Sequence, residues 1–511
     1  LTAVPCTESN FISKSSDSRH PQDRQRAAGA EQHPKVFHDM FQNEPFGHDH
    51  PLSYNQNRYD HNLHTNHASM VTTWCASVLN MTGYTLARPI GRMLLTGSLI
   101  VFCFIGVTES QQTDSVHMIP VEGEGAQYWS RWRGPSGQGV AADAGYPDTW
   151  SETDNVIWRT RVPGTGNSSP VVWGNRIFLT TGRTGGRRLS ILSYRRSDGT
   201  LLWETEVIPG RRESVHAKNG PASATPVTDG ERVYVSFGSR GIVAVDFEGN
   251  QLWHTEVGPI DNYHGPAGSP LLYKDRIIIY QDQRQGGFVA AYDTRTGEQV
   301  WQTNRQASVG WGTPVAIRVG DHDELIVSSQ RKVNAYDPDT GSELWSCGGN
   351  LFEVIPTPVV GAGLVFCTSG RAGPTLAIRP GGRGDVTNTH LAWKTTRGSP
   401  FIPSPLVYGD YLYTLNDMAS IVTCFEAATG QVMWQERLGR PMREGFSASP
   451  IAVDGKVFFT NDNGHTFVLK AGPEFELLRI NDIGARTLAS PALVDGHWYL
   501  RTEQELLAIG N

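Results

Sequence analysis

From about Arg131 onward, short apolar runs of strand length are separated by turns rich in Gly, Asp and Asn. Eight of these runs follow a Ser-Pro or Thr-Pro pair, and the prolines recur at spacings of 41 to 56 residues. Pro is tolerated at the first position of a strand because that residue need not donate to the ladder. A fixed period of this size is typical of repeat architectures. The eight prolines are Pro170, Pro226, Pro270, Pro314, Pro358, Pro405, Pro450 and Pro491.

A second anchor runs in phase with the prolines. Turn-plus-tryptophan segments end at Trp203, Trp253, Trp301, Trp345, Trp393 and Trp434. Each unit therefore reads as strand A after the proline, strand B, a hairpin, strand C, an Asp/Gly turn and strand D ending at Trp. Four antiparallel strands per unit, repeated eight times, predict an all-β fold: an eight-bladed β-propeller spanning residues 131–511.

The two ends of the repeat predict how the ring closes. The eighth unit stops at Asn511 without a strand D, whereas the segment around Trp158 has the form of a strand D with no unit of its own. We expect this N-terminal strand to complete the last blade, because such pairing removes an exposed sheet edge. The seventh unit departs from the pattern by carrying Leu478 where a Trp is expected.

The first 130 residues have a different composition. Residues 1–80 are rich in His, Asn, Gln and Ser and lack an apolar period, so we expect them to be disordered or not translated. Residues 81–110 place Arg88 and Arg92 before an apolar run from Met93 to Val107, the layout of a signal peptide or an uncleaved N-terminal anchor. Residues 111–130 read as a polar linker. The sequence therefore predicts export, to the periplasm or outside the cell, with membrane contact only through that segment.

Charge and cysteine content exclude some functions. The formal net charge of -7 gives no reason to expect a nucleic-acid partner. Three of the six cysteines, Cys347, Cys367 and Cys424, lie in the repeat region, and this odd number does not outline a disulfide framework. Cys347 with Cys367 is the one pair worth testing; the alternative is three buried thiols. Nothing in the sequence indicates an oligomer, so we expect a monomer.

The pattern Asp-x-x-Thr-Gly-x-x-x-Trp, present as Asp293 to Trp301 and Asp337 to Trp345, resembles the tryptophan-docking repeat of the quinoprotein, or PQQ-like, propellers. The similarity covers roughly 380 residues, and the segment from Trp129 to Gly139 also resembles exported PQQ-like proteins, some named after polyvinyl-alcohol dehydrogenase. Large members of the family are alcohol dehydrogenases that hold pyrroloquinoline quinone (PQQ) and Ca²⁺ in the central funnel. Small members include the propeller subunit of the outer-membrane barrel assembly machinery, which binds proteins and no cofactor.

The resemblance also implies what a quinone site would need. The quinone-binding enzymes stack PQQ between a Trp and a disulfide of two adjacent cysteines, and they bind calcium through Glu, Asn and Asp. This chain has no adjacent cysteines. Trp311 could provide an aromatic floor, or could equally pack at the funnel wall. We therefore expect no cofactor, no metal ligand and no catalytic residue, and keep PQQ with Ca²⁺ as the alternative.

Candidate binding residues can be sorted by face, because the loops from D to the next A share one face of a propeller with the B to C hairpins. We expect a ligand on this loop face, although the same residues could instead be solvated or could pack between blades. The D to A loops supply His216, Lys218, Asn219, His264, Trp311 and Arg443, and the hairpins supply Arg240, Arg284, Arg331 and Arg371.

Two functions remain open from the sequence. The first is an exported, non-catalytic scaffold that binds a protein or a polymer on the loop face. The second is a PQQ/Ca²⁺-dependent oxidoreductase that acts on an alcohol or on polyvinyl alcohol. The fold cannot choose between them, because one propeller hosts many functions.

Overall fold

The computed structural model of the chain divides into two units, Leu1–Phe104 and Ile105–Asn511. It describes residues 116–207, 213–306, 309–371, 373–441 and 445–511, all in the second unit. The predicted disordered tract and the signal or anchor segment lie outside the described residues. Among the residues that are described, no helix is long and apolar enough to cross a membrane.

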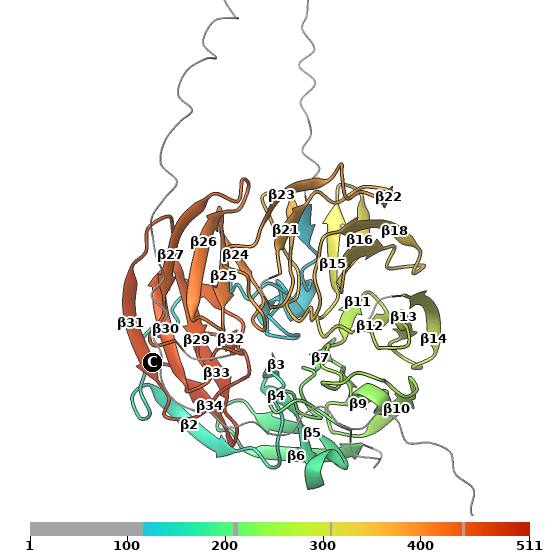
Figure 1. Cartoon of the computed structure of the whole chain (residues 1–511). Helices are drawn as coiled ribbons and strands as arrows, with labels where there is room; N and C mark the ends of the chain where they lie inside the picture. The colour runs from blue at the N-terminus through green and yellow to red at the C-terminus, as the bar shows by residue number, and fades with distance from the viewer. Residues whose placement is uncertain (1–115, 208–212, 307–308, 372, 442–444) are drawn as a thin grey trace, which may run out of the picture. The chain divides into compact units, whose positions relative to one another are not determined.

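The second unit is a ring of eight β-sheets, which confirms the eight-bladed propeller (Figure 1). Blade 1 contains β3 (Val171–Trp173), β4 (Arg176–Arg183), β5 (Arg188–Arg195) and β6 (Leu201–Val207). Blade 2 contains β7 (Val227–Thr228), β8 (Arg232–Ser236), β9 (Ile242–Asp246) and β10 (Gln251–Thr255). Blade 3 contains β11 (Leu271–Tyr273), β12 (Arg276–Gln281), β13 (Gly287–Asp293) and β14 (Gln299–Arg305). Blade 4 contains β15 (Val315–Val319), β16 (His322–Ser328), β17 (Lys332–Tyr336) and β18 (Glu343–Gly348).

The second half of the ring follows the same order. Blade 5 contains β19 (Val359–Gly361), β20 (Leu364–Thr368), β21 (Thr375–Ile378) and β23 (Leu391–Thr395). Blade 6 contains β24 (Leu406–Tyr408), β25 (Tyr411–Asn416), β26 (Ile421–Glu426) and β27 (Val432–Arg437). Blade 7 contains β28 (Ile451–Val453), β29 (Lys456–Thr460), β30 (His465–Lys470) and β31 (Leu477–Asp482). Blade 8 contains β32 (Ala492–Val494), β33 (His497–Arg501), β34 (Glu505–Ile509) and β2 (Val156–Arg161). Short 3-10 turns occur at Gly123–Gln127, Thr184–Gly186 and Gly238–Arg240.

The ring closes as the sequence predicts. Strand β2 pairs antiparallel with β34, with Val156 opposite Ile509, so the last blade takes its outer strand from the N-terminal side of blade 1. The Trp158 indole then donates to the backbone oxygen of Arg196 in blade 1 at 3.1 Å. Closure thus joins the two ends of the repeat through a sheet ladder and through a contact between blades.

The Trp-containing repeat is explained by packing between blades. Trp301 of blade 3 donates its indole N–H to the backbone oxygen of Pro338 in blade 4 at 3.1 Å. Gly341 lies over the same ring in a left-handed conformation, with φ of 74°, and a Cβ atom there would stand 2.4 Å from Trp301 Cε3. The repeat therefore needs Gly both for its backbone conformation and for space. Equivalent indole bonds are made by Trp158, Trp203, Trp253, Trp393 and Trp434.

Blade 4 departs from the repeat at both edges. Strand β1 (Val116–Met118) pairs antiparallel with β15 at the inner edge, and β22 (Gly384–Asp385) pairs in parallel with β18 at the outer edge. Trp345 is fully buried and donates its indole N–H to Glu324 of its own blade at 2.9 Å. Residues 111–130 were predicted to be a polar linker because of their composition. Strand β1 lies within this segment and forms part of the folded ring.

The segment after β1 crosses the centre of the ring (Figure 1, cyan). The backbone oxygen of Trp129 accepts from Val172 in blade 1, and that of Ser130 accepts from Thr228 in blade 2. Further on, Val140 forms a β-bridge with Ala452 in blade 7. These contacts with the inner strands of distant blades hold the segment across the channel, and Trp129 is buried in the core. The three cysteines of the ring, Cys347, Cys367 and Cys424, are unpaired and fully buried.

Candidate funnel site

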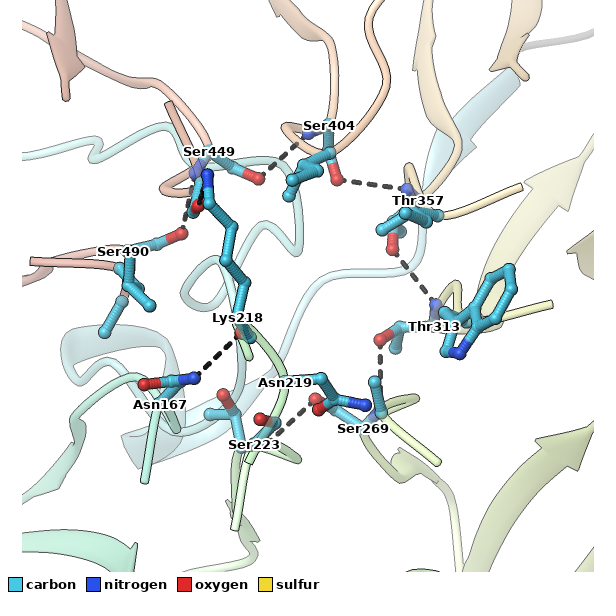
Figure 2. Close-up of a pocket in the computed structure, with 18 of the residues that line it drawn as sticks. Asn167, Lys218, Asn219, Ser223, Ser269, Thr313, Thr357, Ser404, Ser449 and Ser490 are labelled. Carbon is cyan, nitrogen blue, oxygen red and sulfur yellow. Dashed lines mark hydrogen bonds between the residues drawn. The ribbon is translucent and has the colours of Figure 1, made fainter. Parts of the chain in front are cut away.

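A ring of eight hydroxyl groups lines the central channel. The part of the ring from Ser269 to Ser490 is labelled in Figure 2. Each hydroxyl belongs to the Ser or Thr that precedes the proline of a strand A. From blade 1 to blade 8, the backbone N–H of each of these residues donates to the hydroxyl oxygen of the next, at 2.9 to 3.1 Å. Seven such bonds link the blades; between blades 8 and 1, Arg501 instead donates to the Ser168 hydroxyl at 2.6 Å. The ring consists of Ser169, Thr225, Ser269, Thr313, Thr357, Ser404, Ser449 and Ser490.

These hydroxyls line a cavity of about 200 Å³ at the loop face. Six of the ten binding residues predicted from the sequence line the same cavity, together with Trp132, Phe401, Asn167 and Leu488, among others. Loops from blades 1 to 5 therefore converge on one space, as the sorting by face anticipates. The six are His216, Lys218, Asn219, His264, Trp311 and Arg371.

Residues 213–226, which lead into β7, are fixed to the next loop around the ring. The amide nitrogen of Asn219 donates to the backbone oxygen of His264 at 2.8 Å and lies within 3.3 Å of two further carbonyl oxygens, those of Gly265 and Pro266. The backbone N–H of His216 also donates to the oxygen of His264, at 3.1 Å, and the two imidazole centroids are 4.9 Å apart. The Asn219 side chain thus anchors the loop, while the two histidines form part of the cavity wall.

Lys218 reaches from this loop across the funnel to blade 7 (Figure 2). Its ammonium group forms an ion pair with Asp462 Oδ2 at 2.7 Å, and the side chains of both residues are mostly buried. Asp417 of blade 6 lies nearby and is fully buried; its Oδ1 accepts the backbone N–H of Phe401 at 2.8 Å. Burial raises the pKa of Asp417 to about 6, against the opposing effects of these backbone hydrogen bonds and of Lys218.

The opposite wall of the funnel is aromatic. Trp311 is 6% exposed and donates its indole N–H to the oxygen of Gly265 at 2.9 Å, and the His264 ring lies 5.5 Å from it. At the rim, Glu353 accepts from the Tyr263 hydroxyl at 3.0 Å and pairs with Arg371 at 2.6 Å. The wall is therefore built by packing and hydrogen bonding between adjacent blades.

Three other predicted arginines, Arg240, Arg284 and Arg331, do not line the cavity. Arg240 donates to the backbone oxygens of Gly186 and Arg187 and so joins blades 1 and 2. Arg284 pairs with Asp261 at 2.6 Å. Arg331 is exposed, has a φ of 73°, and its backbone N–H donates to the oxygen of Leu351. Arg443 lies outside the described residues.

A second hollow adjoins the funnel. This groove, of about 980 Å³, runs beside blades 8 and 1 and is lined by glycine-rich loops that include Gly164, Gly166 and Gly220. Four residues line both the groove and the funnel cavity: Asn167, His216, Asn219 and Leu488. The two spaces therefore meet at these four residues.

Several residues of the site were missed by reasoning from the sequence alone. The Ser/Thr-Pro pairs marked the repeat, but their hydroxyls were not recognised as a ring, although eight copies of one polar residue next to the inner strand were a usable signal. Trp132 was missed because it lies in the central segment, before the repeat begins. Asp462 lies on the hairpin between β29 and β30, at the loop face, but only arginines of these hairpins were taken as candidates. Their positions depend on the central segment and on an ion pair between distant blades.

The residues of the funnel do not fit the quinone and calcium site that the resemblance implied as an alternative. No Asp or Glu is among the described residues that line the cavity. In the same part of the chain, no group of three His, Cys, Asp or Glu side chains could hold a metal ion. Ca²⁺ prefers several carboxylate and carbonyl oxygens, so this donor set is unsuited to it.

The fold, the docking repeat and the ring closure define a PQQ-like β-propeller. The family model described as outer membrane protein assembly factor BamB matches residues 122–285 and 285–509, and the chain belongs to this family.

Relatives of known name are distant. The tetrathionate hydrolase of Acidithiobacillus ferrooxidans is 21% identical over 386 residues, which cover 68% of this chain and 65% of the hydrolase. The polyvinylalcohol dehydrogenase of a Pseudomonas species is 26% identical over 29% of this chain and 24% of that enzyme. The assembly factor BamB of Burkholderia pseudomallei is 26% identical over 55% of this chain and 72% of its own length. The chain thus spans less than two thirds of the two enzymes that it matches.

Solved structures agree on the fold. BamB from Moraxella catarrhalis aligns with a TM-score of 0.53 at 14% identity, covering 70% of this chain and 97% of that one. The quinohemoprotein alcohol dehydrogenase from Comamonas testosteroni aligns with a TM-score of 0.54 at 12% identity. The alignment covers 75% of this chain and 81% of the dehydrogenase. Both the assembly factor and the oxidoreductase share the architecture, so the fold alone does not assign a function.

Proposed function

We propose that this protein is an exported, non-catalytic scaffold that binds a segment of a protein or polymer at the loop face. The observation that carries the proposal is the junction of groove and funnel at Asn167, His216, Asn219 and Leu488. An extended chain can lie along the groove while one of its groups enters the cavity. A cavity of about 200 Å³ is below the ~300–1,000 Å³ typical of sites that enclose a whole small molecule.

Exposed apolar side chains beside the funnel support a macromolecular ligand. Tyr263, Leu351 and Phe352 are 38%, 43% and 51% exposed, and the Tyr263 ring lies 5.5 Å from Trp311 in the cavity wall. Leu351 and Phe352 directly precede Glu353, which bonds to Tyr263. Apolar and aromatic side chains that remain exposed next to a cavity are typical of binding surfaces.

The relatives named assembly factors of the outer membrane support a protein partner and a place in the cell envelope. The pattern of a signal peptide in residues 81–110, with two arginines before an apolar run, independently supports export. Cell fractionation combined with N-terminal sequencing of the mature protein tests this part. A mature protein found only in the cytosol would contradict it.

Site-specific photo-crosslinking in the native cell tests the binding role. A photoreactive amino acid at His216 or His264 should crosslink to a defined ligand, identified by mass spectrometry, because both side chains line the cavity. The matched control is the same amino acid at Asp275, whose side chain is 65% exposed on the turn between β11 and β12, at the opposite face. Equal labelling at all three positions would contradict a loop-face site.

The dehydrogenase alternative is tested on the purified full chain with PQQ and Ca²⁺. Because the described lining lacks carboxylates, we expect neither a bound quinone spectrum nor reduction of a dye by alcohols. Stoichiometric quinone binding with turnover of an alcohol would overturn the scaffold proposal in favour of the enzyme.

A further inference from the structure

The hydroxyl ring has unused hydrogen-bonding capacity. Seven of its hydroxyl oxygens accept a backbone N–H, and within the part of the chain that the structure describes none of the eight hydroxyls donates to a protein acceptor. A hydroxyl carries one donor and two acceptor positions. Each therefore keeps an O–H donor, and at least one lone pair, for whatever occupies the cavity.

The charges in the cavity wall are already neutralised. Lys218 and Arg371 are the cations other than histidine in the described lining, and each has a carboxylate partner. Lys218 pairs with Asp462 at 2.7 Å, and Arg371 pairs with Glu353 at 2.6 Å. An anionic ligand would lose its hydration without gaining an unpaired cation, which makes its burial unfavourable. A neutral ligand meets no such cost.

The size and the lining of the cavity further restrict the class of ligand. The cavity holds about 200 Å³, and its lining combines the polar ring with three aromatic side chains, those of Trp132, Trp311 and Phe401. A single ring with hydroxyls on its edge and apolar faces matches this combination, since its hydroxyls both donate and accept as those of the protein do. Peptide side chains that are uncharged offer at most one or two such groups.

We propose that the funnel binds one neutral, hydroxyl-bearing ring, a sugar unit of an uncharged glycan, through the eight-membered hydroxyl ring. This inference names the ligand of the proposed scaffold and so rests on it. The groove would hold the units that follow along the chain.

The test is calorimetric titration of the purified full chain with cellobiose, followed in parallel by the fluorescence of its tryptophans. We expect saturable binding of cellobiose and at least tenfold weaker binding of the matched acid, cellobiouronic acid. A capped tetra-alanine peptide serves as the protein-like probe. Equal or tighter binding of the acid or the peptide, or no binding of cellobiose, would overturn the proposal.

A matched pair of variants assigns the binding to the ring. Thr313→Val removes a ring hydroxyl that accepts the N–H of Ser269, whereas Thr303→Val removes a hydroxyl bond to Gly341 between the same two blades but away from the channel. Both lose one contact between blades 3 and 4. Only Thr313→Val should weaken cellobiose binding, by about three- to tenfold for one neutral hydrogen bond.

Thr313→Ser keeps the hydroxyl and should retain wild-type affinity, which guards against a failure of Thr313→Val to fold. Equal losses for Thr313→Val and Thr303→Val would refute the role of the ring. If crosslinks at His216 identify a protein ligand while cellobiose does not bind, the glycan inference fails and the scaffold stands.

Discussion

Asp417→Asn should stabilise the protein at neutral pH. Asp417 is fully buried, its Oδ1 accepts the N–H of Phe401, and its Oδ2 has no hydrogen-bond partner among the described residues. Burial raises its pKa from 3.8 to about 6. Because the raised pKa means that the folded state disfavours the carboxylate, stability is lost as pH rises through 4 to 6. Asn keeps an acceptor oxygen for Phe401 and carries no charge.

The magnitude follows from the pKa. A shift of about two units corresponds to about 3 kcal/mol, since one unit is worth ~1.36 kcal/mol. Above pH 7, the free energy of unfolding of Asp417→Asn should therefore exceed that of the wild type by up to about 3 kcal/mol. The difference should shrink as the pH falls through 6 and vanish near pH 3, below both pKa values. Guanidinium unfolding of both proteins at about pH 3, 6 and 8 measures it.

Two results would refute this reasoning. If Asp417→Asn is less stable than the wild type at pH 8, the carboxylate is stabilising and Lys218 must compensate its burial. If the difference between the proteins does not depend on pH, Asp417 does not titrate in this range. Asp454→Asn, on the turn between β28 and β29 at the opposite face, is the control for a general effect of removing a negative charge.

Three further predictions concern the contacts between blades. Gly341→Ala should lower the free energy of unfolding by about 3 kcal/mol, and Gly363→Ala by only about 1 kcal/mol. Both glycines have a positive φ, but only Gly341 faces an indole ring. Equal losses of stability in thermal or chemical unfolding would contradict this. Trp158→Phe should cost about 1–2 kcal/mol, since it removes the indole bond that closes the ring, and unfolding curves unchanged from wild type would show that this bond is dispensable. Asp462→Asn should lower the free energy of unfolding by about 3 kcal/mol, because it leaves the mostly buried Lys218 without its carboxylate partner. The double variant Lys218→Met/Asp462→Asn should recover part of that loss of stability. A double variant less stable than both single variants would contradict the pairing.

The fold was predictable because the repeat records contacts that recur in each blade. Gly341 and Trp301 occur in one motif because one packs on the other across a blade interface, so the sequence pattern is the imprint of that contact. The closing strand at Trp158 followed from the same motif. Strands β1 and β22 could not be predicted, because each is only two or three residues long, belongs to no repeat and pairs with an edge of blade 4.

The site was predictable only in part, for a related reason. The loop face brings His216, His264 and Trp311 together because their places in the repeat put them at the same end of the blades. The ion pairs were not predictable, since Lys218 and Asp462 come from blades far apart in the sequence and no pattern connects them. Of the arginines predicted to bind a ligand, Arg284 pairs with Asp261 and Arg371 with Glu353, and no pattern in the sequence marks these partners.

This division between repeated and unrepeated residues bears on where specificity arises. Eight equivalent hydroxyls present nearly the same group in every direction, so the ring can bind a polar group but cannot orient it. Orientation requires residues that occur once, and the loop that carries His216 and Lys218 supplies them: Asn219 fixes one side of it to the carbonyls of the next loop, and Lys218 fixes it to Asp462. Removing a ring hydroxyl should therefore lower affinity for all neutral ligands alike, whereas releasing Lys218 should change which of them binds best.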